Sequence, residues 1–194
     1  LKKKYGNIKI MMTRRTDRFI ELAQRAEIAN REIKKDVNGL FISVHVNASI
    51  SPKISGFETY YLSQNPTNEE ARKTAALENN VIILENNAPA DDVEYMEALM
   101  ITTQIQKESS MLADFVQRGM DNKISEFRSR GVHRADFYVL RGALMPAVLA
   151  EIGFITHKKE AASLRKNSYQ DKVAAGVCSG IIKFIDHYNK MIEQ

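Results

Sequence analysis

Short apolar segments alternate along the chain with longer segments in which apolar residues recur at helical spacing. The segments with the length and composition of β-strands are 8–12, 40–48, 57–62, 136–140 and 147–154. Helical spacing runs through 19–33, most of 67–120 and the C-terminal 173–188. Strands that alternate with helices are typical of a sheet covered by helices. We therefore expect a single α/β domain with a mixed, mostly parallel sheet.

The composition narrows the functional classes. With 194 residues, 44% apolar and 27% charged, the chain resembles an ordinary globular domain. The net charge of +4 is spread without a run of five like charges, so nothing supports nucleic-acid binding. Cys178 is the only cysteine, which excludes an internal disulfide and a zinc site built from several cysteines. No apolar run approaches the ~18 residues of a membrane span, so we expect none.

The segment LFISVHVNA, residues 40–48, contains a histidine near the end of an apolar strand. Side chains alternate across a strand, so Leu40, Ile42, Val44 and Val46 share one face. Ser43, His45 and Asn47 share the other face, which becomes polar where the chain leaves the sheet. His45 is therefore either a hydrogen-bonded structural residue or part of a functional site.

The segment MPAVLAEIGF places a second polar group, Glu151, at the end of another apolar strand. An ionised carboxylate buried there without a partner would cost several kcal/mol or stay protonated. The perturbed pKa of such a carboxyl group suits a general base near neutral pH. The alternative is a structural ion pair with Arg141 or Arg134.

His45 and Glu151 together suggest a hydrolase site. In open α/β sheets, sites form outside the carboxyl ends of strands. Imidazole is a common ligand for Zn²⁺, and zinc hydrolases pair the metal with a nearby carboxylate base. One histidine does not hold a metal by itself, so the residues alone leave the ligand set open.

Further motifs follow one another over nearly the whole chain. They are TRRTD, FISVHVNA, SGFETYYL, DFYVLRGALMPAVLAEIGFITHKKE and a closing amphipathic helix. In this order they resemble the zinc-dependent N-acetylmuramoyl-L-alanine amidases of the amidase type 3 family. The resemblance implies a mostly parallel sheet flanked by helices. It also implies hydrolysis of the amide between N-acetylmuramic acid and the L-alanine of the peptidoglycan stem peptide.

The resemblance also implies roles for individual residues. In that family two histidines and one glutamate hold Zn²⁺, and a further glutamate assists the chemistry. His45 matches the second histidine ligand, and Glu151 matches the catalytic glutamate. Asn47 and Arg141 are candidates for orienting the ligands or the substrate.

Two family motifs are not found in this sequence. The first histidine lies in a GHGG-like strand end, and the ligand glutamate opens the following helix; Glu21, Glu27 and Glu32 do not match it. We expect both ligands upstream of residue 1, together with the first strand and most of the first helix. A piece that begins at Leu1 is then expected to hold zinc weakly and to be poorly active.

The segment from about 85 to 110 is a candidate regulatory insert. In division-associated family members a helix inserted here blocks the active site with a glutamate, and an activator protein relieves the block. By resemblance, Glu94 and Glu97 are candidates for this autoinhibitory role. The alternative is an ordinary packed helix with a solvated acidic edge.

Two functional hypotheses follow. The first is a zinc amidase acting on peptidoglycan in cell-wall remodelling or daughter-cell separation. The second is a non-catalytic peptidoglycan-binding or regulatory protein of the same fold that has lost its zinc. The substrate class implies the periplasm or the cell exterior.

Overall fold

The computed structural model describes residues 1–33, 38–80 and 102–192. The strands are β1 (Phe41–Asn47), β2 (Phe57–Leu62), β3 (Ser129–Ala135) and β4 (Ala147–Phe154). The helices are α1 (Leu22–Asn30), α2 (Glu69–Asn79), α4 (Thr102–Asp121), α5 (Lys158–Leu164) and α6 (Asn167–Ile192), with a 3₁₀ turn η2 (Tyr138–Leu140). No helix in the described part of the chain is long and apolar enough to cross a membrane.

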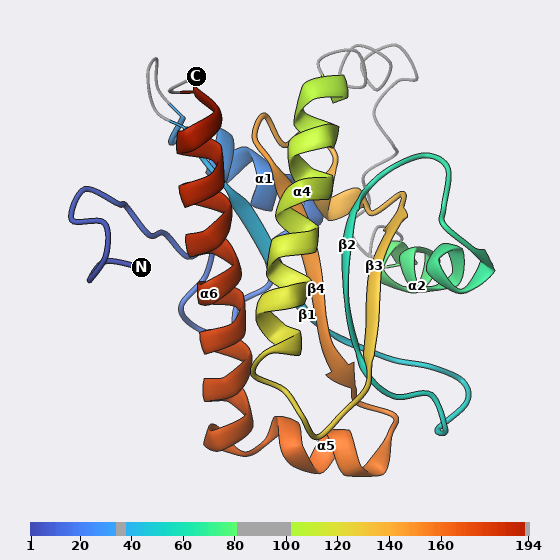
Figure 1. Cartoon of the computed structure of the whole chain (residues 1–194). Helices are drawn as coiled ribbons and strands as arrows, with labels where there is room; N and C mark the ends of the chain where they lie inside the picture. The colour runs from blue at the N-terminus through green and yellow to red at the C-terminus, as the bar shows by residue number, and fades with distance from the viewer. Residues whose placement is uncertain (34–37, 81–101, 193–194) are drawn as a thin grey trace.

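The strands form one sheet in the order β1-β4-β2-β3 (Figure 1). β1 pairs with β4 and β2 pairs with β3 in parallel, whereas β2 and β4 are antiparallel. This confirms the mixed, mostly parallel sheet. β1 and β3 are the edge strands, and β4 lies inside the sheet.

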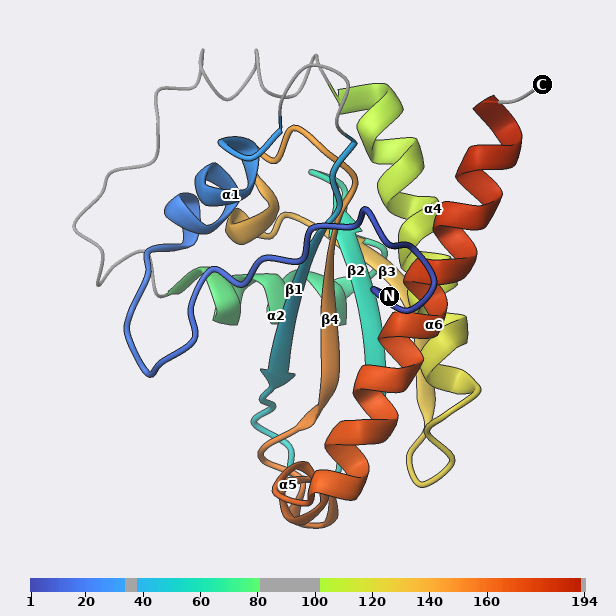
Figure 2. The same cartoon turned by 90° about the vertical axis from the view of Figure 1, so that its left-hand side faces the viewer.

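Helices cover the sheet on both faces (Figure 2). α4 and α6 lie over one face, while α1, α2 and η2 lie over the other. β4 contributes to both apolar cores because its side chains alternate. Val148 and Ala150 face the α4–α6 core, and Ala147 and Leu149 face the α1–α2 core. Glu151 continues the second set, so its side chain lies on the α1–α2 face.

α4 and α6 pack closely because glycines line their contact. Gly119 of α4 faces Gly176 of α6, and a Cβ on Gly119 would lie 2.2 Å from the Gly176 carbonyl oxygen. Gly180, one turn further along α6, lies against the backbone of Phe115 and Val116. The two helices therefore approach with backbone against backbone, and no side chain separates them at these positions.

Three predicted strands are confirmed and two are wrong. β1, β2 and β4 coincide with the segments 40–48, 57–62 and 147–154. Residues 8–12 form no strand, and Ile10, Met11 and Met12 are exposed. Their apolar composition does not suffice because no strand of the described sheet pairs with them.

The segment DFYVL was predicted as a strand, but it is not one. The strand of this region, β3, lies just before it, at Ser129–Ala135. After β3 the chain turns, with the Phe137 N–H donating to the Ala135 carbonyl oxygen and the Leu140 N–H donating to that of Phe137. This turn places the side chains of Phe137, Val139 and Leu140 in the core. A short apolar run shows burial but does not by itself show a strand.

The two faces of β1 differ in how far they are covered. Val44 and Val46, on the apolar face of the strand, are 54% and 41% exposed. The polar face is the more enclosed, because Asn47 is buried and Ser43 and His45 lie under the α1–α2 layer. The apolar alternation therefore predicted the strand correctly but not which face is covered.

Candidate metal centre

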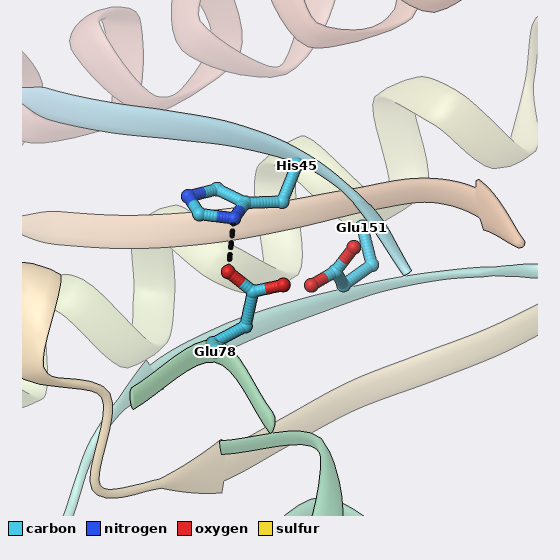
Figure 3. Close-up of side chains that lie close together, drawn as sticks. All are labelled: His45, Glu78 and Glu151. Carbon is cyan, nitrogen blue, oxygen red and sulfur yellow. Dashed lines mark ion pairs between the residues drawn. The ribbon is translucent and has the colours of Figure 1, made fainter. Parts of the chain in front are cut away.

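Three side chains from separate elements meet at one point of the α1–α2 face (Figure 3). They are His45 of β1, Glu78 of α2 and Glu151 of β4, and their nearest donor atoms all lie within 4.8 Å of one another. One imidazole nitrogen and two carboxylate groups form a donor set of the kind that binds a divalent transition metal. The sequence predicted His45 and Glu151 at this place but did not predict Glu78.

The sheet register brings His45 and Glu151 together. In the parallel pair of β1 and β4, His45 stands directly beside Glu151. Both strands run in the same direction, so their polar ends meet at the same edge of the sheet. His45 and Glu151 are therefore neighbours, although β4 continues for three residues after Glu151.

The His45 ring is held through both of its nitrogens. Nε2 lies 2.9 Å from the Ser43 hydroxyl, two residues earlier on the same face of β1. Nδ1 lies 2.5 Å from a Glu78 carboxylate oxygen, as the dashed line in Figure 3 marks. If Nε2–H donates to Ser43, the Nδ1 lone pair points toward Glu78 and is available to a cation.

Glu151 is a buried carboxylate without a partner. It has no exposed surface, and within the described ranges neither of its oxygens has a hydrogen-bond partner. Burial raises the pKa of this carboxyl group well above its usual value, and the charges of Glu78 and Glu58 raise it further. Buried polar groups are normally paired, so an unpaired carboxylate facing His45 and Glu78 fits a bound cation.

The structural ion pair considered for Glu151 is not found among the described residues. Arg141 instead binds Asp136, with Nε donating to one carboxylate oxygen at 2.8 Å and an amino group donating to the other. Its guanidinium also lies 5.2 Å from the centre of the Tyr138 ring. Arg141 thus braces the turn after β3. Its role in orienting the ligands or the substrate stays a prediction.

Glu151 should make the metal-free chain less stable as the pH rises. The folded state raises the pKa of Glu151, so it binds a proton more tightly than the unfolded state does. The contribution of Glu151 to stability is then greatest below its unfolded-state pKa of about 4.3, and it falls as the pH rises toward the raised folded-state pKa. Urea unfolding in the presence of a chelator should show this fall, and Glu151→Gln should flatten it. An unchanged slope in Glu151→Gln would contradict the assignment.

Glu78 was missed, although the sequence contains a signal for it. On α2 the buried positions are Ala71, Thr74 and Ala75, and Glu78 continues this stripe at the next helical interval. A carboxylate on the covered face of a helix indicates a site. What the sequence could not supply is the docking of α2 over β1, which brings Glu78 to His45.

Asn47 and Glu58 form a buried polar network beside the cluster. The Asn47 amide donates to one Glu58 oxygen at 3.1 Å, and Arg130 Nε donates to the other at 3.0 Å. Glu58 is 1% exposed and stands opposite Glu151 in the antiparallel pair of β2 and β4. Arg130 therefore balances a charge that would otherwise lie unpaired next to Glu151. Asn47 lies near the site, as predicted, while Glu58 and Arg130 were missed.

The predicted regulatory insert falls mostly outside the described residues. Glu94 and Glu97 lie in 81–101, whereas residues 102–110 form the first half of α4. The roles assigned to these two glutamates therefore remain predictions.

Comparisons with known proteins show the family to which the chain belongs. A family model described as N-acetylmuramoyl-L-alanine amidase matches residues 1–183. The N-acetylmuramoyl-L-alanine amidase AmiC of Escherichia coli O6:H1 is 30% identical over 183 residues, which are 92% of this chain and 42% of that protein. The endolysin of Bacillus phage SPP1 is 35% identical over 179 residues, covering 92% of this chain and 51% of the endolysin.

Solved amidase structures have the same fold as this chain. The crystal structure of N-acetylmuramoyl-L-alanine amidase from Clostridium difficile 630 matches with a TM-score of 0.62 and 26% identity, covering 95% of this chain and 77% of that one. The chain spans about half the length of the two curated relatives above. Because the family model covers nearly all of it, the chain belongs to the N-acetylmuramoyl-L-alanine amidase family.

Proposed function

We propose that the protein hydrolyses the amide between the lactyl group of N-acetylmuramic acid and the L-alanine of peptidoglycan stem peptides, with Zn²⁺ at the candidate metal centre. The observation that carries this proposal is the buried Glu151, which has no hydrogen-bond partner among the described residues and lies beside His45 and Glu78 in a chain of this family. Zn²⁺ accepts imidazole nitrogen and carboxylate oxygen together, and the family resemblance favours it among the divalent metals that such donors bind.

In the proposed mechanism Glu151 carries the proton transfers. When bound, Zn²⁺ would polarise the scissile carbonyl group and lower the pKa of the attacking water. Glu151 takes the proton from this water, and its raised pKa suits a base that works near neutral pH. It then returns the proton to the leaving nitrogen as the C–N bond breaks. The products are a lactyl carboxylate and a free L-alanine amine.

His45 and Glu78 are the proposed metal ligands. Ser43 fixes the imidazole ring through Nε2, so that Nδ1 faces the centre. A catalytic zinc usually takes three protein ligands and one water. With Glu151 reserved as the base, His45 and Glu78 would supply two of these protein ligands.

Removing either proposed ligand should weaken zinc binding. His45→Ala and Glu78→Ala should each raise the dissociation constant by more than the roughly 10–100-fold that follows loss of an outer-shell partner. Competition with a chromophoric chelator measures this constant. His187→Ala is the matched control, because His187 lies on α6 against Phe115, across the sheet from the centre. Zinc affinity that is unchanged in His45→Ala would contradict the site.

Turnover of Glu78→Ala at saturating zinc separates two roles for this residue. Glu78 lies ahead of the segment at about 85–110 in which the resemblance places an inhibitory glutamate, but its carboxylate contacts His45. Lower turnover would make Glu78 a required ligand, and higher turnover would make it the inhibitory group in place of Glu94 or Glu97.

The non-catalytic alternative is less consistent with Glu151. A binding protein without metal would gain nothing from a fully buried carboxylate that has no hydrogen-bond partner in the described part of the chain. Retention of both His45 and Glu151 supports the enzyme.

A location and a mode of regulation are also proposed. The family of cell-wall amidases is consistent with a place in the cell envelope, and we propose the periplasm or the cell exterior. We also propose that an activator protein acts through residues 85–110. Unchanged activity after deletion of 86–101 from a full-length protein, which spares α4, would contradict autoinhibition by this segment.

A further inference from the structure

The residue next to Glu78 attaches the last turn of α2 to the turn that follows β3. The Asn79 amide nitrogen donates to the Asp136 carbonyl oxygen at 2.8 Å, and its amide oxygen accepts the Tyr138 N–H at 2.9 Å. One side chain thus makes two hydrogen bonds to the backbone of the turn that follows β3. Two bonds from a planar amide fix both the position and the rotation of the group that makes them.

The turn that receives Asn79 is itself rigidly held. Arg141 binds both carboxylate oxygens of Asp136 and lies over the Tyr138 ring. Between Asp136 and Tyr138, Phe137 is fully buried and packs against Tyr60, with ring centres 4.8 Å apart and ring planes tilted by 59°. Asn79 therefore rests on a support with a defined position relative to the sheet.

This attachment bears directly on the metal centre. Glu78 lies in the final turn of α2, one residue before the end of the helix. Its carboxylate must cross from α2 to reach His45 Nδ1 on β1, where the contact is 2.5 Å. A rotation of the last turn would withdraw this carboxylate while leaving His45 and Glu151 on their strands.

We propose that Asn79 is a positioning residue that holds Glu78 at the metal centre and so sets the affinity for the cation. The proposal rests on the proposed function, because it requires Glu78 to bind the metal. It also gives Arg141 a role: this residue braces the turn on which Asn79 is seated.

A double-mutant cycle with ZnCl₂ tests the proposal on the whole chain. Asn79→Ala should weaken zinc binding by about 10–100-fold, the effect of losing a group that orients a ligand. In the Glu78→Ala background the same substitution should have no further effect on zinc affinity, because the carboxylate that Asn79 positions is gone. Thermal unfolding of the metal-free variants shows that each one folds.

Asn122→Ala is the matched control. Asn122 follows α4 and donates to the Arg118 carbonyl oxygen at 2.7 Å, so it also links a helix end to the backbone. It should leave zinc affinity unchanged. The Asn79 proposal is overturned if Asn79→Ala binds zinc as the unsubstituted chain does, or if it weakens binding equally in the Glu78→Ala background. Normal zinc binding by Glu78→Ala alone would instead overturn the donor role of Glu78 in the proposed function.

Discussion

Replacing Glu151 with glutamine is expected to lower the rate of amide hydrolysis by about 10²–10⁴-fold, the usual contribution of a positioned general base. Glutamine has nearly the same shape but cannot accept the proton of the attacking water. The fold should remain at least as stable as before, because the substitution removes a buried carboxylate with no hydrogen-bond partner among the described residues. Release of free L-alanine amino groups from peptidoglycan measures the rate, and urea unfolding measures the stability.

Glu160→Gln is the matched control for Glu151→Gln. Glu160 is also fully buried, but its carboxylate accepts the Gly56 N–H at 2.5 Å and the Phe154 N–H at 2.6 Å. Glutamine can accept only through its oxygen, so one N–H loses its acceptor at a cost of about 1–3 kcal/mol in stability. Glu160→Gln should therefore destabilise the fold, which Glu151→Gln does not. Activity retained in Glu151→Gln would rule out Glu151 as the base.

Substituting Gly180 with alanine is expected to destabilise the fold by about 1–3 kcal/mol or more, as overpacking of a close contact does. The added Cβ would lie 2.5 Å from the Phe115 carbonyl oxygen and 2.6 Å from Val116 Cα. Both atoms belong to the α4 backbone, so the two helices must move apart. The midpoint of urea unfolding, followed by circular dichroism, measures the loss.

The sign of this effect is informative because helix propensity acts in the opposite direction. Alanine is favoured over glycine inside a helix by about 1 kcal/mol. Ala174→Gly, on the exposed face of α6, measures this preference in the same helix and should destabilise by about that amount. If Gly180→Ala stabilised the fold by the same amount, the close approach of α4 and α6 would be refuted.

Period-two alternation predicted β1, β2 and β4 well because these strands carry β-branched and aromatic residues. β3 was missed because SRGVHRA shows no such alternation. As an edge strand it is specified by its pairing with β2, a contact between distant parts of the chain. The same reason explains residues 8–12, whose composition suits a strand but which have no partner in the described sheet.

The candidate site divides along the same line. His45 and Glu151 could be predicted because each is a polar residue in the carboxyl-terminal half of an apolar strand, and these halves of parallel strands lie side by side. Glu78 and Asn79 could not be placed, because their roles depend on how α2 docks over β1 and against the turn at 136–138. Glu58 and Arg130 escaped notice because a buried ion pair leaves no periodic pattern in the sequence.

The most direct test of this account is mass spectrometry of the products released from purified peptidoglycan. Zinc-loaded protein would be compared as this chain and as a version extended upstream, each with and without Glu151→Gln. The account predicts stem peptides with free L-alanine amino termini, at least from the extended version, and their loss in Glu151→Gln. Cleavage of a different bond, or no cleavage by either version, would contradict it.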